Sequence, residues 1–119
     1  MSTTAIAATE AYRSKVALAC ATGAAISPIA FIAFGEGQLP YDIGQVAMQS
    51  EFARVAATVS RNGLLVTAKA TLLGPTVGSR VLREIGALTA DGTLVGRRVV
   101  ASKEFETDTE MDFEITFQY

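Results

Sequence analysis

The chain has 119 residues, of which 50% are hydrophobic and only 18% are charged. This length fits one domain over residues 1–119 with a real core. The low charged fraction favours burial of part of the surface against partners over the alternative of a domain that is merely rich in Ala and Val. The net charge of −2 excludes the basic surface of a nucleic-acid-binding domain, and the lack of histidine excludes Ser-His-Asp, Cys-His and common zinc sites.

The first expected element is a helix over residues 5–22, a segment rich in Ala, Glu, Arg, Lys and Leu. Tyr12, Val16, Ala19 and Cys20 recur at helical spacing and predict one apolar face, in which Cys20 is a small buried residue. Gly23 is expected to end the helix.

A central strand is expected over residues 26–34, because both of its alternating faces are apolar. The uncharged run 16–34 approaches the length of a membrane span, but Gly23, Ser27 and Pro28 interrupt it, so we expect no membrane insertion. Gly35 and Gly37 after this strand predict a turn that needs positive φ.

A short helix is expected over residues 42–49. Asp42 and Gln45 have the spacing of a capping box, with Asp in place of Ser or Thr.

A hairpin is expected from strands over residues 52–59 and 64–73. Asn62 and Gly63 lie between two alternating runs, which is the strongest short hairpin signal. With these as the two turn residues, Val59 faces Val66 and Ala53 faces Leu72, so one face of the pair is apolar.

A second hairpin is expected from strands over residues 81–89 and 94–101, around a type I′ turn at Asp91 and Gly92. Its faces sort less cleanly. One face combines Glu84 and Arg97 with apolar residues (Leu82, Leu88, Val95, Val99, Ala101), and the other combines Arg83 and Ile85 with Arg98 and Val100. Either a bulge shifts the register, or both faces are partly buried and Glu84 pairs with an arginine.

The last strand is expected over residues 111–119, where apolar and polar residues alternate. Acidic residues occupy every second position from Glu104 to Glu114. We interpret this acidic ladder as a solvated face that a turn at 107–109 interrupts, in preference to a partner contact or a calcium site. Together these elements predict an α+β fold, a mainly antiparallel sheet or small sandwich with the N-terminal helix packed on it.

Several phrases, in this order along the chain, resemble the N-terminal domain of phage tail-collar fibre proteins. They are Ala33–Gly37, Glu51–Arg54, and Arg83–Gly86 followed by Ala90–Leu94, which is the most specific match. The chain departs from the family pattern at Val81-Leu82, where the family has an aromatic pair, and at Ala87-Leu88-Thr89. The sequence ends at Tyr119 without a fibre shaft, so the resemblance implies the attachment module alone.

The resemblance implies a non-enzymatic structural protein of the virion tail, made in the host cytoplasm. It would be a baseplate or tail-fibre adaptor that acts as a homo-oligomer, with a trimer favoured, and binds other tail, baseplate or fibre proteins. We expect no catalytic residue, cofactor, metal or nucleic acid. A capsid or neck decoration protein is the alternative, and a host-encoded binding module or enzyme is a third reading. The candidate interface residues are Ile6, Tyr12, Arg13, Val16, Arg83, Glu84, Ile85, Arg97 and Arg98.

Overall fold

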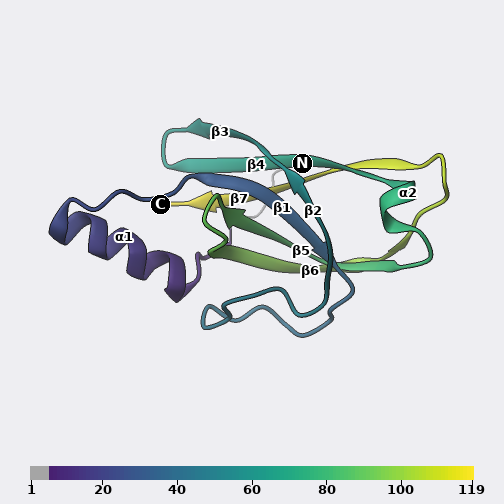
Figure 1. Cartoon of the computed structure of the whole chain (residues 1–119), viewed down its shortest axis with the longest axis horizontal. Helices are drawn as coiled ribbons and strands as arrows, with labels where there is room; N and C mark the ends of the chain where they lie inside the picture. The colour runs from purple at the N-terminus through teal and green to yellow at the C-terminus, as the bar shows by residue number, and fades with distance from the viewer. Residues whose placement is uncertain (1–5) are drawn as a thin grey trace.

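Two antiparallel sheets and a projecting helix make up residues 6–119, the part of the chain that the computed structural model describes (Figure 1). One sheet has the strand order β2-β1-β5-β6 and the other β3-β4-β7. This confirms the predicted α+β class. The elements are α1 (Glu10–Thr22), β1 (Ile29–Gly35), β2 (Glu51–Ala56), β3 (Thr58–Asn62), β4 (Leu65–Leu73), α2 (Gly74–Val77), β5 (Val81–Thr89), β6 (Leu94–Glu104) and β7 (Glu110–Gln118).

The two sheets are joined along both sides. On one side the chain steps from β2 to β3 at Ala57, whose N–H donates to the carbonyl of Ala30 at 2.8 Å. The strand predicted over residues 52–59 is therefore two strands in different sheets. On the other side Ile6 donates to Thr116 of β7 at 3.1 Å, and Thr9 donates to Val95 of β6 at 2.8 Å. The segment 6–9 thus connects the free edges of the two sheets.

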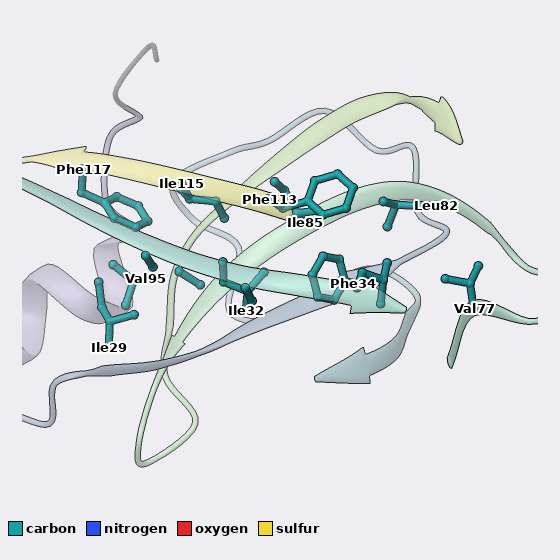
Figure 2. Close-up of a cluster of buried hydrophobic side chains, with 14 of the residues drawn as sticks. Ile29, Ile32, Phe34, Val77, Leu82, Ile85, Val95, Phe113, Ile115 and Phe117 are labelled. Atoms are coloured by element: carbon teal, nitrogen blue, oxygen red, sulfur yellow. The ribbon is translucent and has the colours of Figure 1, made fainter. Parts of the chain in front are cut away.

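The core lies between the sheets and is built from aliphatic and aromatic side chains of β1, β4, β5 and β7 (Figure 2). Ile32, Phe34 and Phe117 have no exposed surface. The rings of Phe34 and Phe113 meet edge to face, with centroids 5.4 Å apart. Such burial contributes about 1.5–3 kcal/mol per large apolar side chain, so this core is the main source of stability.

Helix α1 begins later than expected and buries none of its side chains. Thr9 caps it by accepting the N–H of Tyr12 at 3.1 Å, and Gly23 ends it with a φ of 73°, as predicted. The first residue of the predicted helix, Ala5, lies outside the described residues. The prediction that Cys20 is buried is wrong, because its side chain is exposed.

The short helix predicted over residues 42–49 is wrong, since this segment is an irregular loop. The Asp42 carboxylate accepts the N–H of Gly44 at 3.0 Å, which closes a local turn instead of capping a helix. The N–H groups of Gln49 and Ser50 are bound by a distant carboxylate, described below, and this competes with helix formation.

The β3–β4 hairpin turns one residue later than predicted. Asn62 pairs with Leu65, so Gly63 and Leu64 form the loop, and Val59 faces Ala68 instead of Val66. Gly63 has a φ of 60°, as the first position of a type II′ turn requires. The predicted apolar face is buried on β4, but every residue of β3 is exposed.

The β5–β6 hairpin has the predicted register in its centre, from the Glu84–Val99 pair to the Ala87–Gly96 pair. The predicted type I′ turn is wrong. Gly92 has a φ of 90° and donates to Thr89 at 2.9 Å, while Asp91 does not have positive φ. The loop is therefore the three residues 90–92, with glycine in the position that a bulge requires.

Both explanations offered for the mixed faces of this hairpin are confirmed. The register shifts between Leu82 and Glu84 and again between Ala87 and Leu88. The second shift places Val95 in the core between the sheets, not on the face of Glu84 as predicted. Both faces of β5 are buried.

The acidic ladder is broken as predicted, because Thr107 and Asp108 lie in a turn. In that turn Thr109 donates its N–H to Glu106 at 3.0 Å.

Candidate functional site

A fully buried ion pair lies on the outer face of the four-stranded sheet. Arg97 Nε of β6 is 2.6 Å from Glu84 Oε1 of β5, and neither side chain has exposed surface. We call the loop of residues 36–50 the clasp loop, and Figure 1 shows it running along β5 and β6. The loop covers the pair, so the sequence prediction that Glu84 bonds an arginine is confirmed.

The Glu84 carboxylate binds both ends of the clasp loop through backbone N–H groups. Oε2 accepts from Gly37 and Ser50, each at 2.7 Å, and Oε1 accepts from Gln49 at 3.0 Å. Burial by itself raises the pKa of Glu84, but the hydrogen bonds from Arg97 and these three N–H groups lower it below its ordinary value. The carboxylate is therefore held in its charged form.

Arg97 binds the middle of the same loop. Its Nη1 donates to the carbonyl of Leu39 and lies 3.4 Å from Oε1 of Gln45. Its Nη2 is buried and has no partner among the described residues. The ion pair thus fixes the clasp loop at three places along its length.

Gly35 and Gly37 are required at this site for their small size. A Cβ on Gly35 would lie 2.6 Å from Oε2 of Glu84, and one on Gly37 would be closer still. Neither glycine has positive φ, so the predicted positive-φ turn is wrong. The phrases Ala33–Gly37 and Arg83–Gly86, which carry the family resemblance, therefore meet at the Glu84 carboxylate.

Hydrogen bonds join the clasp loop to the start of α1 and to the segment before it. Glu10 donates its N–H to Ile43 at 2.8 Å, and the Tyr41 hydroxyl donates to Ala7 at 2.6 Å. Two apolar side chains of the loop point to solvent, Leu39 with 53% and Val46 with 72% of their surface exposed. We call α1 together with the clasp loop the projecting surface.

The structure divides the predicted interface residues into two groups. Arg13 is exposed, and Ile6, Tyr12, Val16, Arg83 and Arg98 are half-buried, so all six are accessible. Glu84, Ile85 and Arg97 are covered by the chain itself, which corrects their assignment as interface residues. The clasp loop covers Glu84 and Arg97 on the outer face, and the core between the two sheets covers Ile85 on the inner face.

Sequence reasoning missed Leu18, Leu39 and Val46, which are exposed large apolar residues of the projecting surface. Leu18 falls outside the helical stripe that was predicted to be apolar. Val46 lies in the segment predicted as a helix, and Leu39 precedes that segment. Their apolar character in uncharged surroundings was the signal that could have found them.

An open groove of about 680 Å³ lies between the end of β2 and strands β4 and β7, away from the projecting surface. Its polar side chains pair with each other. The Thr71 hydroxyl donates to Asp112 at 2.5 Å, and Lys69 lies 3.6 Å from Glu114. Within residues 6–119, no group of three or more His, Cys, Asp or Glu side chains is arranged to hold a metal ion.

The fold and these sites define a small α+β domain with a clasped outer loop. Comparison of the chain with protein-family models, with curated proteins and with solved structures found no match. In the described part of the chain, no helix combines the length and the apolar character needed to cross a bilayer.

Proposed function

We propose that this protein is a structural subunit of a phage tail, a baseplate or tail-fibre attachment adaptor that acts as a homo-oligomer without enzymatic activity. The observation that carries the proposal is the projecting surface. Helix α1 extends away from the sheets and buries none of its thirteen residues (Figure 1).

The exposure of α1 supports a docking role on energetic grounds. A helix of this length is marginal in water by itself, and most helices gain their stability from packing an apolar face. In α1, Leu18 is 56% exposed and Cys20 is exposed. Tyr12 at the start of α1 packs against the core of the chain, and contact with a neighbouring protein supplies the packing that the exposed side chains of the helix lack.

The buried ion pair and the clasp loop support the same role by making the projecting surface rigid. The buried pair of Glu84 and Arg97 fixes the clasp loop, and this loop in turn binds the segment that leads into α1. A preorganised surface loses less conformational entropy when it docks. An adaptor needs such a surface and no reactive group.

The choice of a phage tail rests on the resemblance to tail-collar fibre domains. Two of its phrases, Ala33–Gly37 and Arg83–Gly86, supply the glycines and the carboxylate that hold the clasp loop. Purified phage particles from the host that carries this gene test the assignment by immunoblotting. We expect the protein in intact virions and in isolated tails, and its absence from virions would refute the tail role. Detection in capsids alone would favour the decoration-protein alternative.

Self-association is tested separately by light scattering of the purified chain. We expect an oligomer, with three copies favoured. Leu18→Glu and Val46→Glu should shift it toward the monomer, because each places a charge on the projecting surface. Val59→Glu is the matched control, since Val59 is 41% exposed on β3, away from this surface. An oligomer that Val59→Glu disrupts, but that Leu18→Glu and Val46→Glu leave intact, would contradict the assignment of α1 and the clasp loop as the contact between copies.

A further inference from the structure

The edge of β4 facing the groove continues beyond the end of β3. Strand β7 pairs with β4 along its whole length, from Leu65 to Leu73. Strand β3 pairs with β4 only as far as Lys69, which faces Thr58. The residues before Thr58 belong to β2, which pairs with β1 instead, and Ala57 donates its N–H to Ala30. The last part of β4 therefore has a described strand on one edge only.

The hydrogen-bond pattern shows which backbone groups face this open edge. Thr116 pairs with Thr67, yet its carbonyl accepts from Ile6 on the opposite edge of β7. In an antiparallel pair this makes Thr67 and Thr116 a non-hydrogen-bonded pair, whose backbone groups point away from each other. By alternation, the N–H and C=O of Thr71 also point away from β7 and toward the groove.

The groove offers one apolar and one acidic side to whatever lies along that edge. Its apolar lining is Val55, Ala56, Ala70 and Phe113. On the other face of the sheet, Asp112 and Glu114 contribute two negative charges against the single positive charge of Lys69. Glu110 continues the row of carboxylates on β7.

We propose that this groove binds an extended polypeptide segment of a partner protein, which adds to β4 as an antiparallel strand in line with β3. Only an extended chain matches backbone donors and acceptors at this spacing. Its residues directed into the groove are apolar, and the alternate residues, opposite Thr71 and Leu73, are basic. This surface lies away from the projecting surface and does not depend on the proposed role in a phage tail.

The probe is the peptide acetyl-Val-Lys-Val-Lys-Val-amide, titrated into the full chain and followed by NMR. In the proposed register the lysine N–H groups point toward β4 and the valine N–H groups point to solvent. We expect saturable binding, and protection of the Thr71 amide from hydrogen exchange. Methylation of the backbone nitrogens of the two lysines should weaken binding about tenfold or more. Methylation of the backbone nitrogen of the central valine should leave binding unchanged.

A pair of protein variants tests the charge argument. Asp112→Asn should weaken binding about threefold or more, because it removes a carboxylate of the groove. Glu104→Gln is the control, since Glu104 is an exposed member of the acidic ladder that does not line the groove. Equal affinity of the lysine-methylated peptide, contacts mapping to another strand, or no saturation up to about 1 mM peptide would overturn the proposal.

Discussion

Arg97 Nε and Glu84 Oε1 lie 2.6 Å apart with both side chains fully buried, and together they hold the clasp loop against the sheet. Removing one member of such a pair leaves an uncompensated buried charge, which costs about 3–5 kcal/mol. We therefore expect Arg97→Met to lower the free energy of unfolding by about that amount, measured by urea denaturation.

The double variant Glu84→Gln with Arg97→Met serves as the control for this pair. It removes both charges, and it should recover part of the stability lost in Arg97→Met alone. A single variant as stable as the wild type would contradict the role of the pair in holding the loop.

The stability of the protein should fall in acid because of Glu84. Its pKa is lower in the folded chain than the unfolded value of about 4.3. The ionised carboxylate therefore stabilises the fold fully above that value, and this contribution is lost as the pH falls through the lower folded value. Thermal melts between neutral pH and about pH 3 should show this loss in the wild type.

The variant Glu84→Gln should lose the part of this pH dependence that comes from Glu84. A second carboxylate acts in the same direction, because hydrogen bonds from Thr89, Lys15 and Thr93 lower the pKa of Asp91. Asp91→Asn is therefore the companion variant. If Glu84→Gln had the same acid dependence as the wild type, Glu84 would not be linked to folding.

Gly37→Ala should destabilise the fold by about 1–3 kcal/mol, the usual cost of forcing extra volume into a packed site. The added methyl group would collide with the Glu84 carboxylate and with the Gln49 side chain. Gly44→Ala is the matched control in the same loop, since its Cβ would approach only the Asp42 carboxylate, which is exposed to solvent and can move aside. Equal stability of the two variants in urea would show that the loop does not need to approach Glu84 closely.

Gly92→Val should destabilise the β5–β6 turn by about 1–3 kcal/mol, because a β-branched residue is strained at positive φ. Gly92→Asn should cost less, since asparagine tolerates this conformation. Calorimetry of both variants distinguishes backbone strain from a lost contact. A cost that is the same for both would argue against strain at this φ.

The sequence allowed a correct prediction of β5, of the central β5–β6 register and of an arginine as the kind of residue that pairs with Glu84. A carboxylate within an apolar strand has to be neutralised, and an arginine on the adjacent strand can do this. The capture of the clasp loop could not be predicted. It depends on backbone N–H groups 34 to 47 residues away from Glu84, and such groups have no signature in the sequence.

Another departure also arises from a contact between distant segments. The strand predicted over 52–59 divides at Ala57, because its N–H binds β1, and no glycine, proline or change of pattern marks that point. The Asn62-Gly63 signal located the hairpin correctly but not its two turn residues. Gly63 became the first loop residue and Leu64 the second, which moved the register by one pair.

The most direct test of the central claim, that α1 and the clasp loop form an assembly surface, is a cryo-electron map of the parent phage particle. We expect density for this chain in the tail, with Leu18 and Val46 covered by neighbouring subunits. A particle in which the chain is present but both side chains face solvent, or a particle without the chain, would contradict it.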